Sequence, residues 1–107
     1  MCVPYLIVCT YKPGPERITA DLVTRHVEHF VRNLPHVLIG GQLRSGDGST
    51  PLGAMFVLDY EALEDVNRFL RDDPYHQQDV FSSVTVQRFH LMIPEKEPGD
   101  LLRLVTR

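Results

Sequence analysis

The stretch from Met55 to Phe89 limits what this chain can fold into more than any other part of the sequence. It begins with an apolar run, Met55–Leu58, that has the composition of a strand. The residues after Asp59 then repeat apolar side chains at helical spacing, at Leu63, Val66, Phe69 and Leu70. We therefore predict a strand followed by an amphipathic helix with Asp59 as its N-cap.

The end of the same stretch predicts a turn and a further strand. Aspartate caps helix N-termini and proline fits the first helical position, so Asp73 and Pro74 predict a short helical turn, with Tyr75 packed beneath it. Alternating apolar residues between Ser83 and Met92 predict the strand that follows.

The first half of the chain repeats this pattern. Pro4 to Tyr11 reads as a strand that is apolar on both faces. A helix is expected from about Thr19 up to Pro35, with an apolar stripe at Val23, Val27, Phe30, Val31 and Leu34. A short strand at residues 37–39 ends at two glycines, a polar loop at 43–53 is long enough to act as a flap, and a strand follows at 52–58.

The resulting order, β-α-β-β-α-β, is that of a ferredoxin-like α+β fold with a four-stranded antiparallel sheet. Two helices can cover only one face of such a sheet. Because the strands at both ends of the chain carry apolar residues on both sets of positions, we expect a second copy to cover the other face. The sequence thus predicts a homodimer that pairs as an α+β barrel, or a higher oligomer built from such dimers.

Composition limits the classes of partner. The chain has 107 residues, and we expect one domain at residues 1–93 and a tail at 94–107 that docks on the domain or on its dimer partner. A formal charge of -3 without a Lys/Arg cluster argues against a nucleic-acid or anionic membrane surface. No leader-like or membrane-spanning stretch is evident, so the cytoplasm is the expected location.

The two cysteines are expected to be free thiols. Cys2 and Cys9 lie seven positions apart on one predicted strand, which separates them by about 23 Å at ~3.3 Å per residue. This separation is far beyond disulfide reach. The position of Cys9 within the strand favours a small buried hydrophobe over a nucleophile.

Two histidines on the first predicted helix are candidates for chemistry. His26 lies at the flank of the apolar stripe and His29 about 60° further toward solvent, so His26 is the better candidate. Histidine exchanges protons near neutral pH, which suits a general acid or base. A hydrogen bond within the fold is the alternative for His26. A metal site on both histidines, with His36, His90 or Asp47 as a third ligand, is disfavoured because no acidic or cysteine motif accompanies them.

Other candidate site residues are spread along the chain. Asp47 lies in the sequence Ser45-Gly-Asp-Gly-Ser49, where it could act as the carboxylate partner of His26 or only stabilise a turn. Substrate contacts are predicted at Tyr11, Gly41, Ser49, Tyr75 and Arg88. Gly41 could present a backbone N–H to an anion, and Arg88 alternates with Val84 and Val86 on one strand face, at a ligand site or a dimer interface.

The pieces of the sequence, taken together, resemble the YCII-related (YciI-like) family of the dimeric α+β barrel superfamily. The resemblance rests on Lys12-Pro-Gly14, His26-Val-Glu-His-Phe30, Val37-Leu-Ile-Gly-Gly41, Gly53, and Asp73-Pro-Tyr75 before Val84-Thr-Val86. It implies a dimeric ferredoxin-like fold with a cleft that holds a histidine paired with an aspartate. One branch of the family resembles dehydrochlorinating enzymes of chlorinated-aromatic breakdown.

The chain departs from the family pattern at three places. Tyr11 stands where the family often has an aspartate, Val23 where an arginine commonly precedes the histidine, and Gln42 where a proline follows the glycine. The carboxylate that usually pairs with the histidine is therefore absent from its usual position.

Two functions follow from the sequence. The first is a cofactor-independent enzyme in which His26 performs acid/base chemistry, an elimination or isomerisation, on a small polar or aromatic metabolite. Its alternative is a non-catalytic dimeric module that binds a metabolite or a protein. A carboxylate within hydrogen-bond reach of His26 would favour the enzyme.

Overall fold

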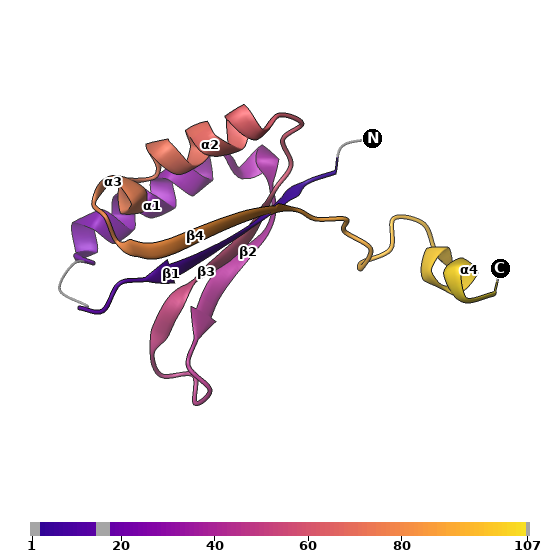
Figure 1. Ribbon diagram of the computed structural model, residues 1–107, viewed down its shortest axis with the longest axis horizontal. Helices are drawn as coiled ribbons and strands as arrows, with labels where there is room; N and C mark the ends of the chain where they lie inside the picture. The colour runs from indigo at the N-terminus through magenta and orange to yellow at the C-terminus, as the bar shows by residue number, and fades with distance from the viewer. Residues whose placement is uncertain (1–2, 15–17, 107) are drawn as a thin grey trace.

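The molecule is built on a four-stranded antiparallel sheet with helices on one of its faces (Figure 1). The computed structural model describes residues 3–14 and 18–106, so that Cys2 lies outside the described residues. The strands are β1 (Tyr5–Tyr11), β2 (Val37–Arg44), β3 (Pro51–Leu58) and β4 (Phe81–Arg88). They are arranged in the order β2-β3-β1-β4, and each neighbouring pair is antiparallel. The predicted ferredoxin-like α+β fold is confirmed.

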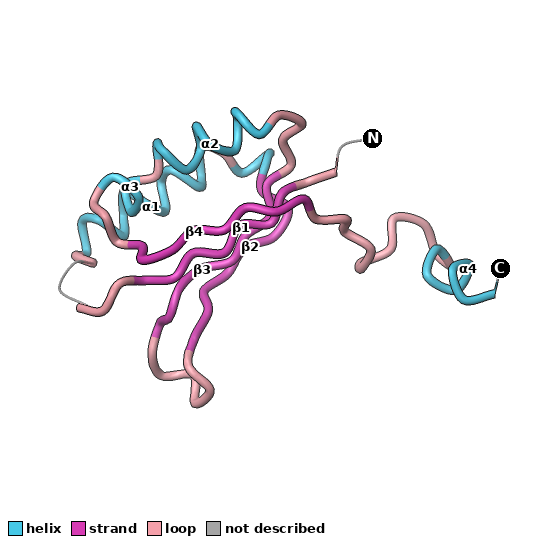
Figure 2. The backbone as a smooth tube through the Cα atoms, in the orientation of Figure 1, coloured by secondary structure: helices cyan, strands magenta, loops and turns pink. Residues whose placement is uncertain are grey.

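Three helices lie on the same face of the sheet, as Figure 2 shows. They are α1 (Ala20–Arg32), α2 (Leu63–Asp72) and the short α3 (Pro74–Gln77). A 3-10 turn, η2 (Leu34–His36), connects α1 to β2, and α4 (Asp100–Thr106) ends the tail at a distance from the sheet. Within the described part of the chain, no helix has the length and apolar character needed to cross a membrane.

The alternation of side chains along β1 divides the sheet into two faces. Ile7 and Cys9 point to the helices and are fully buried, where they join Phe56 and Leu58 of β3 in the hydrophobic core. Leu6 and Val8 point to the opposite face and are only half-buried. The register aligns Val8 with Met55, which places these apolar residues on a face that no helix covers. We call this surface the open face.

The buried side of α1 differs from the predicted stripe. Leu22 and His29 are buried and Phe30 packs against the core, whereas four apolar residues of the predicted stripe are 39%, 52%, 57% and 56% exposed, namely Val23, Val27, Val31 and Leu34. The prediction was wrong because it centred the buried stripe on Val27 and Phe30 and placed His29 about 60° further toward solvent. Counting the two histidines instead as core-facing shifts the buried side of the helix toward His26 and His29.

The predicted flap is a β-hairpin. β2 extends to Arg44 and pairs with β3 up to Arg44 and Pro51, which leaves only residues 45–50 as the connection. Gly40 and Gly41 therefore lie within β2 and not at its end. Cross-strand pairing overrides the weak strand propensity of the glycines and the polar residues that follow them.

The start of α2 also differs from the prediction. The N-cap position is Ala62, which makes no side-chain capping bond, and Asp59 instead donates its backbone N–H to the carbonyl of His36 at 2.7 Å. By contrast, the predicted cap of α3 is confirmed, because the Asp73 carboxylate accepts the backbone N–H of Tyr75 and Pro74 occupies the first turn.

Candidate functional site

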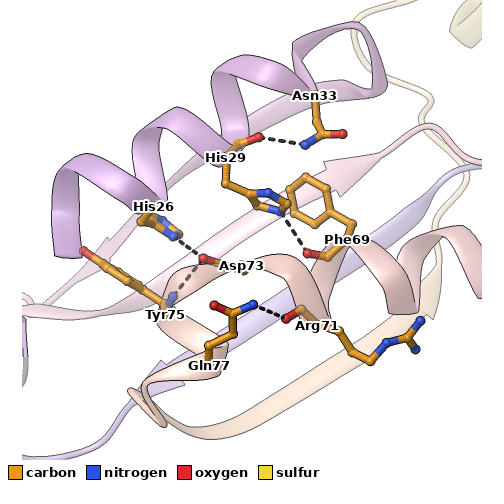
Figure 3. Close-up of polar contacts among 8 residues, drawn as sticks. All are labelled: His26, His29, Asn33, Phe69, Arg71, Asp73, Tyr75 and Gln77. Carbon is orange, nitrogen blue, oxygen red and sulfur yellow. Dashed lines mark hydrogen bonds and ion pairs between the residues drawn. The ribbon is translucent and has the colours of Figure 1, made fainter.

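The candidate site lies where α1 crosses the junction of α2 and α3 (Figure 3). His26 projects from the second turn of α1, a helix whose start is set by the Thr19 side chain accepting the backbone N–H of Leu22. Its Nδ1 lies 2.7 Å from Oδ1 of Asp73. The imidazole is 15% exposed and the carboxylate is fully buried. Two segments 47 residues apart in the sequence thus form a short, shielded His–Asp pair.

Asp73 has a double role that follows from its position. Its Oδ1 accepts the backbone N–H of Tyr75 at 3.0 Å, which begins α3, and the same oxygen faces His26. Because a carboxylate oxygen accepts hydrogen bonds, Nδ1 of His26 carries the proton and Nε2 is left as the acceptor. The other carboxylate oxygen, Oδ2, has no hydrogen-bond partner among the described residues. A helix cap therefore also fixes the tautomer and the orientation of the imidazole.

Aromatic rings pack against the imidazole of His26. The ring of Tyr75 stacks on the imidazole with centroids 3.7 Å apart and planes at 9°. Phe30 lies 5.0 Å away on the same helix, and Tyr11 meets Tyr75 edge to face at 6.2 Å. Stacking of this kind restricts rotation of the imidazole about its side-chain bonds. The geometry thus preorganises His26 from two directions.

Helix geometry predicted that His29 lies toward solvent, but the structure shows that it does not. It is 4% exposed, and its Nε2 lies 2.9 Å from the backbone carbonyl of Phe69. This bond satisfies an α2 carbonyl and ties the two helices together. His29 is thus bonded within the fold, and of the two histidines only His26 meets a carboxylate.

The structure does not bring Asp47 to His26. Its Oδ1 accepts the Ser45 hydroxyl and both the backbone N–H and the hydroxyl of Ser49, all within the β2–β3 connection. These bonds, that of Ser45 first, lower the pKa of Asp47 to about 2. Asp47 and Ser49 stabilise the turn, and the carboxylate that meets His26 is that of Asp73.

The remaining predicted contacts fall in different places. Tyr11 and Tyr75 adjoin the His–Asp pair. Gly41 lies in the middle of β2, opposite Met55 on the open face. Arg88 pairs with Tyr5 at the other end of β1, where it lies over the Tyr5 ring and bonds the carbonyls of Val3 and Glu61.

Sequence reasoning missed Asp73 as the partner of His26. It identified the residue as a helix cap, and a capping bond needs only one lone pair of one carboxylate oxygen. The remaining lone pairs stay available to a donor from another element. A signal was present in the sequence. If Tyr75 packs beneath the turn, the capping aspartate beside it is also expected to be buried, and a buried carboxylate requires a partner.

Cys9 is buried close enough to this site for the Asp73 charge to affect its pKa. It is a free thiol with no exposed surface. Burial, with a smaller contribution from the Asp73 charge, raises the pKa of Cys9 to about 12. Burial, followed by the neighbouring Tyr11 and Asp73, likewise raises the pKa of Tyr75 to about 12. Both groups keep their protons throughout the neutral pH range, so Tyr75 can act there as a hydrogen-bond donor.

We expect the protein to lose stability steeply above pH 9. The unfolded chain releases the Cys9 proton at its ordinary pKa of 9.0 while the folded chain holds it up to about 12, so unfolding releases a proton in this window. The free energy of unfolding should then fall by about 1.4 kcal/mol per pH unit, with Tyr75 adding a second such term above pH ~10. Urea unfolding at pH 8 to 11 measures the slope. Cys9→Ala should flatten it between pH 9 and 10, and equal slopes in the two proteins would contradict the expectation.

The site offers little to a metal ion. Within residues 3–14 and 18–106, no group of three or more His, Cys, Asp or Glu side chains is placed to bind one. His26 and His29, the pair at helical spacing, engage Asp73 and the Phe69 carbonyl. The chemistry that the arrangement supports is proton transfer through the Nε2 atom of an oriented imidazole.

Solved structures of similar fold include two enzymes. The 5-chloro-2-hydroxyhydroquinone dehydrochlorinase TftG from Burkholderia phenoliruptrix, solved with 2,5-dihydroxybenzoquinone, matches at a TM-score of 0.72 and 20% identity, over 80% of this chain and 92% of that chain. SnoaB, a cofactor-independent oxygenase from Streptomyces nogalater, matches at a TM-score of 0.51 and 18% identity, over 86% of this chain and 96% of that chain. At these identities the likeness establishes the fold.

Comparison of the sequence with curated proteins gave no match. The sequence model of the YCII-related domain, however, matches residues 3–90, which is most of the chain. The resemblance seen in the sequence is thereby confirmed, and the chain belongs to the YCII-related domain family.

Proposed function

We propose that this protein is a cofactor-independent enzyme that transfers a proton on a small polar or aromatic metabolite, with His26 as general acid/base and Asp73 as its positioning residue. The observation that carries the proposal is the 2.7 Å contact between Nδ1 of His26 and Oδ1 of the fully buried Asp73. A histidine with a purely structural role does not need a buried carboxylate as its hydrogen-bond partner. A backbone carbonyl is sufficient, as it is for His29.

The proposed step begins at Nε2 of His26. This nitrogen removes a proton from a carbon or oxygen atom of the substrate, while Nδ1–H continues to donate to Asp73. In an elimination, the electron pair of the broken bond forms a new double bond and the leaving group departs with its own electrons. In an isomerisation, His26 returns the proton to a different atom of the substrate. The buried Asp73 stabilises the imidazolium that exists between the two transfers.

Tyr75 and Tyr11 are proposed to contact the substrate. Tyr75 stacks on the imidazole, and its pKa of about 12 keeps the phenol protonated, so its hydroxyl can donate to a substrate oxygen. Tyr11 stands next to it and contributes an aromatic edge. Gly41 and Arg88 are left out of the proposed site, because Gly41 lies on the open face and Arg88 bonds backbone carbonyls at the far end of β1.

The reaction class is supported by the two structural neighbours. One is a dehydrochlorinase of 5-chloro-2-hydroxyhydroquinone, and the other is a cofactor-independent oxygenase. A small hydroxylated aromatic or carbonyl compound is therefore the proposed substrate class. We also propose that the enzyme works as a homodimer in which the open faces of two sheets meet, since Leu6, Val8 and Met55 remain only partly covered there.

Ligand screening tests the proposal. Thermal shifts are measured with 2,5-dihydroxybenzoquinone and with a library of small phenols, quinones and carbonyl compounds, because a ligand of the native state raises the melting temperature. Every compound that binds is then assayed for turnover with wild type, His26→Gln and the control His36→Gln. His36 is exposed and lies in η2, outside the proposed site. We expect His26→Gln to lower turnover by about 100-fold or more, and the control to be unaffected.

Two results would contradict the proposal that this protein is an enzyme using His26. Turnover that survives His26→Gln unchanged would remove His26 from the mechanism. Binding without turnover of any bound compound would favour the alternative function, a dimeric module that binds a metabolite.

A further inference from the structure

The C-terminal segment at residues 89–106, called the arm below, leaves the domain after β4 and ends in α4. We propose that the arm packs on a second copy of this chain and supplies a large part of the dimer interface. The inference rests on the homodimer proposed above and adds to it the segment that holds the two copies together. Four observations carry it: the arm's apolar side chains, its local order, its direction, and the uncharged open face.

The arm exposes apolar side chains to an unusual degree. Ile93 is 71% exposed and Val105 is 80% exposed, with Met92 and Leu104 also exposed. Single exposed apolar residues are common on protein surfaces, but several within one short segment mark an interaction site. The arm therefore has the side chains of a segment that is covered by protein.

The arm is nevertheless locally ordered by polar contacts. The Glu95 carboxylate accepts the backbone N–H groups of Gly99 and Leu101, at 3.3 Å and 2.8 Å. The Asp100 carboxylate accepts the backbone N–H of Glu97 at 3.0 Å and pairs with Arg103. These bonds stabilise the turn that leads into α4, so the helix presents its apolar residues without first packing on the domain.

The arm also points away from the rest of the molecule. In Figure 1 it continues outward from the end of β4, and α4 lies well apart from the sheet and the other helices. The radius of gyration is 15.9 Å, whereas a compact domain of this length has one of about 13 Å. An arm that extends from one copy can be covered by another.

The open face is uncharged. Its β4 positions are the polar residues Ser83, Thr85 and Gln87. Its apolar residues lie on the other three strands, and all but the buried Val57 are at least partly exposed: Leu6, Val8, Met55, Val57, Ile39 and Leu43. Four strands at ~4.8 Å spacing and ~25 Å length give a flat footprint of roughly 480 Å². A stable interface buries about 800 Å² of accessible surface per partner. The exposed apolar side chains of the arm add to the area that two copies can bury.

A second copy is the occupant that fits both surfaces. Every regularly paired position of the open face is uncharged, which suits neither nucleic acid nor an anionic membrane. Each chain carries one arm and one open face, so two copies related by a twofold axis can cover both arms and both faces in a single closed assembly.

The test compares the dimer dissociation constant of three proteins by sedimentation equilibrium. Ile93→Asp combined with Val105→Asp removes the two most exposed apolar side chains of the arm and lowers the net charge by two. Lys96→Asp, at an exposed polar position of the same arm, lowers the charge equally and is the matched control. We expect the double variant to dissociate at least about 100-fold more readily, since burial of each side chain changes the constant roughly tenfold or more. The control should remain within about threefold of wild type.

Each outcome decides the question. If wild type is a dimer and the double variant has the same dissociation constant, the proposed role of the arm is wrong and the proposed dimer is supported. The proposed role of the arm is also wrong if the variant loses thermal stability independently of protein concentration, because the arm would then dock on its own domain. A wild type that stays monomeric at every concentration overturns both arm and dimer. The serine variant, Ile93→Ser with Val105→Ser, separates lost packing from added charge, and should weaken the dimer as well.

Discussion

Asp73→Ala is expected to lower the free energy of unfolding by about 3 kcal/mol, the sum of a lost helix cap and a lost hydrogen bond to His26. Both bonds end on the same buried oxygen, so a single substitution leaves the Tyr75 amide and the imidazole of His26 without their partner. Urea unfolding measures the effect. Asp72→Ala is the matched control, because Asp72 is exposed and adjacent, and it should change stability by less than about 0.5 kcal/mol. Equal stabilities of the two variants would contradict a structural role for the pair.

Asp73→Asn separates the structural role from the chemical one. The amide keeps an oxygen that can accept from Tyr75 and His26, so stability should stay within about 1 kcal/mol of wild type. The amide carries no charge to stabilise an imidazolium, and turnover of the compound found by screening should fall by about 100-fold or more. Nitrogen-15 NMR of the imidazole supplies a readout that needs no substrate: wild-type His26 should be protonated at Nδ1, whereas the alanine variant should show a mixture of tautomers. Unchanged turnover in Asp73→Asn would exclude Asp73 from the mechanism.

Gly53→Ala is expected to destabilise the protein by about 3 kcal/mol, although alanine is the smallest possible change. A Cβ atom at this position would lie 2.0 Å from the Cys9 carbonyl oxygen and 3.2 Å from the Thr10 Cα atom, both of which belong to the backbone of the neighbouring β1. Backbone cannot rotate away as a flexible side chain can, so the two central strands β1 and β3 must separate at this end of their pairing. For a domain of this size the melting temperature should fall by more than about 10 °C.

Gly41→Ala is the matched control for this prediction. Gly41 lies within the neighbouring strand β2, and a Cβ atom there would meet no other atom within 4 Å. The substitution should change the melting temperature by no more than about 3 °C. If Gly53→Ala and Gly41→Ala have the same melting temperature, the close approach of β1 and β3 at Gly53 does not constrain the fold.

Much of the fold was predictable because it depends on short-range patterns. Alternation in Tyr5–Tyr11 predicts a strand covered on both faces, and the helical repeat of Leu63, Val66, Phe69 and Leu70 predicts α2. The errors came where a tertiary contact overrides the local pattern. Pairing with β3 extends β2 through Gly40 and Gly41, and the bond between Asp59 and His36 removes Asp59 from its predicted cap.

The sequence by itself determined the family and the order of the elements, and it identified His26 as a candidate, because these depend on patterns of neighbouring residues. Only the tertiary structure decided which group His26 contacts. Its partner is 47 residues away, and sequence reasoning assigned that partner, Asp73, solely to capping a turn. The burial of His29 was decided in the same way, by a carbonyl of α2. A side chain's hydrogen bonds depend on which elements pack against it, and the spacing of residues along one helix does not predict which elements those are.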